Sequence, residues 1–438
     1  KIDALKVVDW TDEISIDEHV VLHVAEDEVW LSLAESTVMR TAIDNVADNT
    51  WKLLGMSRVM GYDIKETLHS LADAGISTSI DEVHDIRQAA FLLDPLQRDR
   101  SLIALYGGEI DLASPGEVTA ALWSVYKTQQ EAFSFKPKVA DIAERFDFPL
   151  VRLLFDIERR GVKIDTNRLH EMSKELGSEY QTFQQQMYDM VGYEFNIGSP
   201  AQLGEVLFTK LQLPTTGIKR GKTGYSTDQK TLDKLKGQHP IIDLIERTRE
   251  LAKLKNTYVD ALPELADEHG RLHTTFNQDV AATGRLSSTA PNLQNIPIRS
   301  ELGRTIRTAF VAETGNVLVS ADYSQFELRL AAVLADDKDL IEDFNSGVDI
   351  HTKTASETYG IPLEEVTKDQ RRAAKVINFG VLYGMSPHGL SAATGMSFPE
   401  AKKFIDQYFE LRAPIRKFID ATLKQAADEG FVETYFWR

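Results

Sequence analysis

The first 144 residues alternate short apolar runs with stretches of helical periodicity. Two apolar runs, 20–24 and 29–33, are separated by the acidic segment 25–28, a pattern that predicts a β-hairpin. Apolar residues recur at helical spacing within 64–72 and 116–131. Strands mixed with helices in this way predict an α/β layer structure.

Beyond residue 144 the pattern becomes mainly helical. Asp165 or Thr166 is suited to cap a helix that runs to residue 187, because short polar side chains satisfy the free N–H groups of a first turn. Two further helices are predicted over 399–408 and 413–428, and Gly430 is a stop signal for the second.

One segment combines strand character with a carboxylate. Residues 317–321 are apolar and rich in β-branched side chains, the run ends on Asp322, and a helix-like segment follows over 327–334. This predicts a strand that delivers a carboxylate at its carboxyl end, where oxygen donors suit Mg²⁺ together with substrate phosphates. A buried strand that ends in a solvated turn would also explain the pattern.

A second segment places cations and aromatic residues at a spacing of four. Arg371, Lys375, Phe379 and Tyr383 fall on one face of a predicted helix that begins at Lys368. Cations suit triphosphate oxygens, and an aromatic ring further along can stack on a base or sugar. Core packing explains the aromatic residues equally well, but it explains the two cations less well.

Composition limits the classes of protein that fit. The 438 residues allow two or more domains, and the absence of cysteine excludes disulfides and thiolate metal sites. No apolar run of membrane-spanning length and no signal-peptide pattern is found, so we expect a soluble, cytoplasmic protein without membrane partners. A net charge of −18 argues against a general polyanion binder, so nucleic acid would need a local cationic groove.

One local cluster and one further lysine could provide such a groove. Lys219, Arg220 and Lys222 lie among glycines in 218–224, where they could contact duplex phosphates without reading sequence. A flexible solvated loop is an equal explanation of that cluster. Lys255 closes the same helical region.

A strand is predicted at 272–278, and a polar, turn-rich segment follows it over 283–297. Side chains of this segment could bond the acceptors that every base pair presents in the minor groove. Plain surface would have the same composition. The candidate residues are Arg285, Asn292, Gln294 and Asn295.

Three segments together resemble a known family. Residues 317–329 resemble motif A of the family A DNA polymerases, the bacterial DNA polymerase I type with its Klenow-like large fragment. Residues 371–384 resemble their motif B, and 283–297 resemble the segment of that family that touches the primer–template. The resemblance is close from Arg145 onward and loose before it.

The resemblance implies a multidomain α/β (α+β) fold. Residues 1–144 would be a ribonuclease-H-like domain of the 3′–5′ exonuclease type, and 145–438 a right-hand polymerase domain. Within the latter, the thumb would occupy about 190–260, the palm about 261–340 and the fingers about 341–438.

The resemblance also implies template-directed DNA synthesis from dNTPs in replication and repair, by a monomer that binds primer–template DNA. Asp322 and the carbonyl of Tyr323 would hold two Mg²⁺ ions, and Lys375 would be the general acid for pyrophosphate. Nucleotide binding is implied for Gln325, Glu327, His351, Arg371, Lys375, Phe379 and Tyr383. DNA binding is implied for Lys219, Arg220, Lys222, Lys255, Arg285, Asn292, Gln294, Asn295 and Arg329.

The sequence departs from the family in two places. The exonuclease acids are not where the family needs them, since 25–28 reads Ala-Glu-Asp-Glu inside a turn; we expect a proofreading fold without its chemistry. The His-Asp-Glu of motif C is not found, which implies an incomplete palm and poor primer extension.

Two alternatives remain open. One is a non-catalytic module that binds primer–template. The other is a single-subunit phage-type RNA polymerase, which has a related palm; ribonucleotide incorporation would decide.

Overall fold

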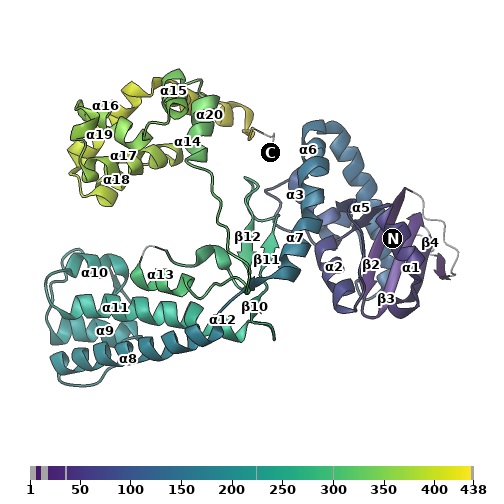
Figure 1. The fold of residues 1–438 in the computed structure, drawn as a ribbon, viewed down its shortest axis with the longest axis horizontal. Helices are drawn as coiled ribbons and strands as arrows, with labels where there is room; N and C mark the ends of the chain where they lie inside the picture. Colours follow the sequence, from purple (N-terminus) through teal and green to yellow (C-terminus); the bar gives the residue numbers. More distant parts are fainter. Residues whose placement is uncertain (1–5, 11–17, 35–36, 223, 299, 436–438) are drawn as a thin grey trace. The chain divides into compact units, whose positions relative to one another are not determined.

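The computed structural model shows two compact units along the chain. The first comprises Lys1–Leu318 with the end of the chain, and the second Val319–Thr434 (Figure 1). Within them, the structure describes residues 6–10, 18–34, 37–222, 224–298 and 300–435. In these described ranges no helix is both long and apolar enough to cross a membrane.

A six-stranded sheet forms the centre of the N-terminal part of the first unit, in the order β1-β4-β3-β2-β5-β6. Its middle strands β2, β3 and β4 form an antiparallel meander, whereas β5 and β6 run parallel to β2 and β1 parallel to β4. The bounds are β1 Lys6–Asp9, β2 His19–Ala25, β3 Glu28–Ala34, β4 Thr37–Ala42, β5 Arg58–Gly61 and β6 Val83–Asp85. The predicted hairpin is therefore confirmed, with Glu26 in its turn at a φ of 53°.

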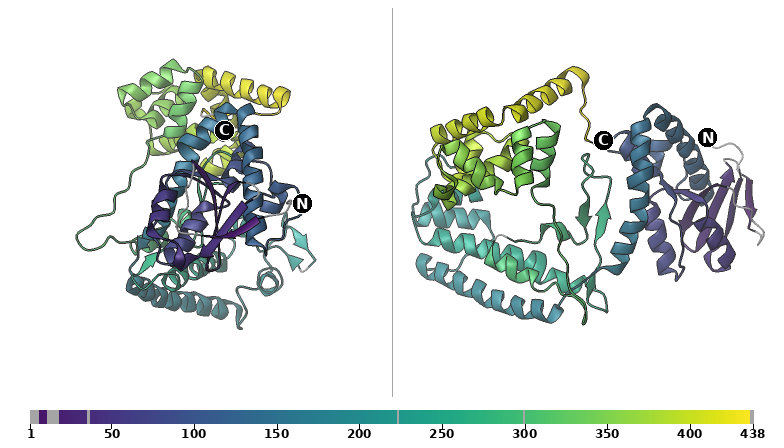
Figure 2. Two further views of the ribbon diagram at one scale, coloured as in Figure 1. Left: turned by 90° about the vertical axis from the view of Figure 1, so that its right-hand side faces the viewer. Right: turned by 45° about the horizontal axis from the view of Figure 1, so that its top comes forward.

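Helices cover both faces of this sheet because side chains alternate along each strand. Val20 and Leu22 belong to a core with residues of α1, α2 and α7, whereas Val21 belongs to a second core with residues of α5. Figure 2 shows these helices around the purple strands. Their bounds are α1 Asp48–Gly55, α2 Ile64–Asp73, α5 Pro115–Phe135 and α7 Phe148–Arg160, which confirms the helices predicted at 64–72 and 116–131.

The remaining helices of the first unit pack mainly on other helices. Asp165 caps α8, since its carboxylate accepts the N–H of Arg168 at 2.9 Å, and the helix continues beyond residue 187 to Val191. The helices are α3 Ile86–Leu93, α4 Leu102–Tyr106, α6 Pro137–Ile142, α8 Thr166–Val191, α9 Pro200–Glu205, α10 Gln229–Leu235, α11 Ile241–Leu254, α12 Ala261–Glu264 and α13 Glu301–Arg307.

Short two-stranded ladders complete the first unit. The strand predicted at 272–278 is wrong as a single element, since it divides into two strands with different partners. Thr274 lies between the two strands. It is buried, and its hydroxyl forms a hydrogen bond with the Ser288 hydroxyl at 2.6 Å. The pairs are β10 (Arg271–Leu272) with β7 (Val162–Lys163), β11 (Thr275–Asn277) with β12 (Ser287–Thr289), and β8 (Arg220–Gly221) with β9 (Gly224–Tyr225).

The second unit is helical in its described residues. Helices are confirmed where the sequence predicted them at 399–408 and 413–428, and Gly430 ends the last one with a left-handed φ of 81°. The helices are α14 Phe326–Leu334, α15 Lys338–Ser346, α16 Ile350–Tyr359, α17 Lys368–Gly380, α18 Pro387–Thr394, α19 Phe398–Leu411 and α20 Ala413–Glu429.

The strand predicted over 317–321 is not formed. This segment is irregular, and the side chains of Val317 and Val319 are 80% and 84% exposed. A strand needs a neighbour that takes its N–H and C=O groups, and no strand in the described ranges pairs with this segment. The apolar pattern alone therefore predicted a structure that depends on a pairing partner.

Candidate nucleotide and nucleic-acid sites

Helix α17 presents the predicted cationic face. Ala374 and Ile377 are buried in the core of the second unit, whereas Arg371 and Lys375 are exposed. An α-helix has 3.6 residues per turn, so residues four apart lie on nearly the same face, and Arg371 and Lys375 share one side of α17. The last aromatic residue, Tyr383, lies in a short 3₁₀ turn (Val381–Tyr383) that continues from the helix.

Arg371 is held by an acid from the neighbouring helix. Its guanidinium nitrogen lies 2.6 Å from the Asp349 carboxylate, which also caps α16 by accepting the N–H of Thr352 at 2.7 Å. The hydrogen bond from Arg371 lowers the pKa of Asp349, and the same pair raises the pKa of Arg371. Arg371 is thus a fixed cation whose remaining N–H groups can serve an anionic ligand.

His351 lies beneath the α17 face. It is buried, its ring centroid is 5.8 Å from that of Phe379, and its Nδ1 is 3.1 Å from the amide nitrogen of Asn378. Burial lowers the pKa of His351, and the charges of Arg371 and Lys375 lower it further against the opposing effect of Asp349. These effects favour the neutral imidazole, which lies between its own helix α16 and the Phe379 ring of α17.

The start of α14 meets the end of the α17 segment. The Tyr383 hydroxyl donates to the Glu327 carboxylate at 2.6 Å, which joins two of the predicted nucleotide-binding residues. Gln325, just before α14, has a left-handed φ of 47°. Arg329 donates to the Ser324 carbonyl at 2.9 Å and lies 4.3 Å above the Phe344 ring.

The predicted metal ligands lie just before α14. Asp322 and Tyr323 are both exposed in an irregular stretch, and the Tyr323 ring is 5.2 Å from that of Phe326. Among the described residues, no group of three or more His, Cys, Asp or Glu is placed so that it could hold a metal ion.

In the first unit, the basic segment contains a short antiparallel ladder, β8 with β9, where the sequence predicted a loop. Lys219, Arg220 and Lys222 are all exposed on or beside β8 and β9. The Arg220 guanidinium lies 5.3 Å from the Tyr225 ring, a cation–π distance that keeps the cation at the surface.

The other predicted DNA-binding residues have internal partners to different degrees. Lys255 is only half-buried but is paired, since its ammonium lies 2.6 Å from Asp260. Asn292 accepts the N–H of Gln294 at 3.1 Å, and the Gln294 amide donates to the Leu286 carbonyl at 3.1 Å. The Asn295 carbonyl accepts from the Tyr258 hydroxyl at 2.5 Å.

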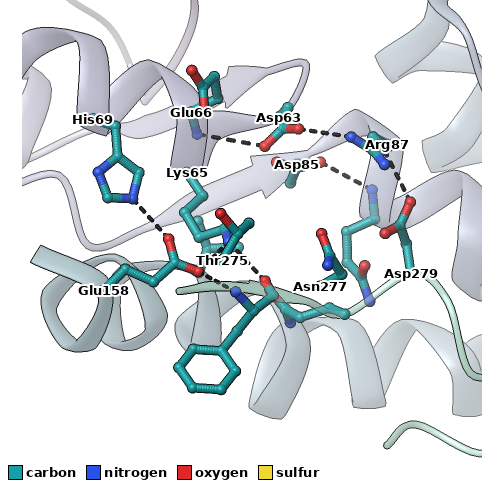
Figure 3. A pocket seen from close by; sticks show the side chains of 14 residues that line it. Asp63, Lys65, Glu66, His69, Asp85, Arg87, Glu158, Thr275, Asn277 and Asp279 are labelled. Atoms are coloured by element: carbon teal, nitrogen blue, oxygen red, sulfur yellow. Dashed lines mark hydrogen bonds and ion pairs between the residues drawn. The ribbon is translucent and has the colours of Figure 1, made fainter. Parts of the chain in front are cut away.

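Sequence reasoning missed a buried polar network in the first unit, shown in Figure 3. Its centre is Glu158, only 4% exposed, which accepts from Lys65 at 2.5 Å and from the N–H of Phe276 at 2.6 Å and contacts His69 at 2.7 Å. A signal was available: Glu158 follows Val151 and Leu154 at positions of the apolar face of α7, where an acid is out of place.

Comparison with known proteins identifies the family. Residues 166–438 match the model described as DNA polymerase family A. The match covers more than half of the chain, so the chain belongs to that family.

Individual relatives agree with this assignment. The thermostable DNA polymerase I of Thermus thermophilus is 46% identical over 352 residues, which are 80% of this chain and 42% of that protein. The DNA polymerase I of Pseudomonas aeruginosa is 46% identical over 329 residues, 74% of this chain and 36% of that protein. The chain therefore spans less than half the length of these relatives.

A solved structure is similar over most of the chain. The POL domain of Pol1 from M. smegmatis, in a complex with DNA primer-template and dNTP, has a TM-score of 0.85 and 31% identity. The similarity covers 96% of this chain and 77% of that one. The mixed α/β fold of this chain thus resembles that of a polymerase domain.

Proposed function

We propose that this chain belongs to an enzyme that adds deoxynucleotides to the 3′ end of a primer under the direction of a template. The observation that carries the proposal is the exposed face of α17, where Arg371 and Lys375 stand one turn apart. Two cations at this spacing match the oxygens of a triphosphate. Family membership and a relative solved with primer-template and dNTP support it.

The residues of the second unit would share the work of nucleotide binding. Arg371, oriented by Asp349, and Lys375 would bind the phosphates, and the ammonium of Lys375 would give a proton to the leaving pyrophosphate. Tyr383 would hold Glu327 by their 2.6 Å hydrogen bond, so that this carboxylate crowds the 2′ position of an incoming ribonucleotide. His351 would support α17 from below rather than act as a free cation.

Magnesium fits the donors that the second unit offers. Asp322 provides an exposed carboxylate, and the Tyr323 carbonyl adds a second hard oxygen, which suits Mg²⁺ bound jointly with substrate phosphates. When bound, Mg²⁺ would neutralise phosphate charge and favour the attacking 3′ oxygen. We propose the two-ion form of this chemistry by analogy with phosphoryl transfer in general.

The N-terminal part, residues 1–144, is proposed to be a ribonuclease-H-like domain that has lost its proofreading chemistry. The strand order β4-β3-β2-β5-β6, with an antiparallel meander followed by parallel strands, supports the fold. The turn at Glu26 supports the loss, since Glu26 and Asp27 lie in the hairpin turn and only Glu28 lies on a strand, at the first position of β3. A mismatched primer should keep its 3′ nucleotide when it is incubated with the protein and Mg²⁺.

The test of the main proposal is primer extension with Mg²⁺ and four dNTPs, beside a fluorescence titration of labelled primer–template. Replacement of Asp322 or Lys375 by alanine should abolish extension and leave DNA affinity nearly unchanged. Arg416, an exposed cation in an i,i+4 pair on α20, provides a matched control. Equal use of ribonucleotides would favour the RNA polymerase alternative, and DNA binding without turnover would favour a non-catalytic module.

A further inference from the structure

Strand β11 of the β11–β12 hairpin and the start of its loop are held by side chains from the N-terminal part and from the segment that follows it. The two strands pair with Thr275 opposite Thr289 and Asn277 opposite Ser287. The loop between them carries Arg285, which is exposed. The stem of this hairpin therefore fixes the two ends of the loop that carries Arg285.

Asp279 lies in the loop two residues after the end of β11, and it is only 8% exposed. Its carboxylate lies 2.9 Å from Nε of Arg87, and its backbone carbonyl accepts from Nη2 of Arg100 at 2.7 Å. Arg87 is itself held by Asp63, whose carboxylate lies 2.8 Å from Nη1. Both arginines come from the N-terminal part, Arg87 on α3 and Arg100 just before α4.

Strand β11 and the residue after it are anchored at further points, by Lys65 of the N-terminal part and by Asp147 and Glu158 of the segment that follows that part. The ammonium of Lys65 donates to the Phe276 carbonyl at 2.7 Å, and the N–H of Phe276 donates to Glu158 at 2.6 Å. The Gln278 side chain donates to the Asp147 carbonyl at 3.0 Å. Three of the four residues 276–279 are thus bound to groups outside the hairpin.

The cavity among these groups is a clamp rather than a ligand pocket. Figure 3 shows the charged side chains turned toward one another, with Arg87 between Asp63 and Asp279 and with Lys65 on Glu158. The side chains of Asp279 and Glu158 are only 11% and 4% exposed, so the loss of a cationic partner would leave a poorly hydrated charge and the paired geometry is favoured.

We infer that Asp279 is a positioning residue: the clamp of Arg87 and Arg100 on Asp279 fixes the hairpin so that Arg285 meets the primer–template. The N-terminal part would then serve polymerisation as a scaffold for the nucleic-acid surface. This inference rests on the proposed function, since it requires that Arg285 contact DNA.

The experiment is a double-mutant cycle on DNA affinity, measured by fluorescence anisotropy of a labelled primer–template. Asp279→Asn should weaken binding about five- to tenfold, because a charge-assisted contact to Arg87 is lost. Arg285→Ala should weaken it by at least as much. The double variant should bind as the Arg285→Ala variant does, since Asp279 acts only through the loop that carries Arg285.

Controls separate positioning from loss of fold. Arg159→Gln removes the ion pair between Arg159 and Asp73, which does not touch the hairpin. This variant should leave the affinity for primer–template unchanged. Thermal unfolding checks that each variant is folded. If Asp279→Asn unfolds, Arg87→Gln repeats the test with the Arg100 contacts in place.

The outcomes are distinct. In one, the unmodified chain binds primer–template while Asp279→Asn leaves the affinity unchanged, or lowers it by the same factor with and without Arg285→Ala. Either result would overturn the positioning role and leave the proposed function intact. No binding of primer–template by the unmodified chain would contradict the proposed function and the inference together.

Discussion

Replacement of Glu158 by alanine should strongly destabilise the first unit. The carboxylate is 4% exposed and accepts from Lys65 and the Phe276 N–H, with His69 at 2.7 Å. Alanine leaves the Lys65 ammonium, itself only 13% exposed, with a carbonyl as its remaining partner. Removal of one partner from such a network costs about 3 to 4 kcal/mol of unfolding free energy.

The measurement is urea unfolding followed by tryptophan fluorescence, because Trp30 and Trp51 are buried against the N-terminal sheet. A loss of that size should lower the urea midpoint by about 1.5 to 2 M for a transition with a slope near 2 kcal/mol per molar. Asp156→Ala is the matched control on the same helix, since its pair with Arg152 is exposed and worth below about 1 kcal/mol. Equal midpoints for the two variants would refute the reasoning.

The pH dependence gives a second check on Glu158. Burial alone would raise the pKa of Glu158, but the bonds from His69, Lys65 and the Phe276 N–H reverse this and lower it below its ordinary value of 4.5. A lowered pKa in the folded state means that the stabilisation is present above pH 4.5 and is lost as the pH falls further. The difference between the unmodified protein and Glu158→Ala should therefore shrink in acid.

Three further predictions concern other sites. Arg412→Ala should destabilise the second unit by about 3 kcal/mol or more, because this 3% exposed guanidinium lies between two carboxylates at 3.0 and 3.1 Å. Hydrogen exchange in α15 should become faster in this variant, whereas Arg416→Ala, which removes an exposed ion pair, should leave it unchanged. Burial lowers the pKa of His84 to about 3, so the stability of the N-terminal part should fall as the pH drops below 6.5. In His84→Gln the urea midpoint should depend less on pH over this range. Tyr383→Phe removes the hydrogen bond that orients Glu327, so discrimination against ribonucleotides in extension assays should fall roughly tenfold; unchanged discrimination would contradict this role.

Local pattern was sufficient where an element needs only its own residues. The hairpin at Glu26, the helix capped by Asp165 and the helix ended by Gly430 form as predicted, because turn and cap residues act over a few positions. The same holds for the face of α17, since helical spacing alone separates Arg371 and Lys375 from the core side. The roles of these two cations remain predictions.

Tertiary structure decided the rest, because it depends on residues far apart in the chain. The segment around Val319 has every local mark of a strand, yet no described strand pairs with it and it stays irregular. His351 could have been a surface or capping histidine, but packing against Phe379 buries it. The bonds from Arg87 to Asp279 and from Lys65 to Glu158 span from 93 to 192 positions, a separation at which neither spacing nor composition specifies a contact.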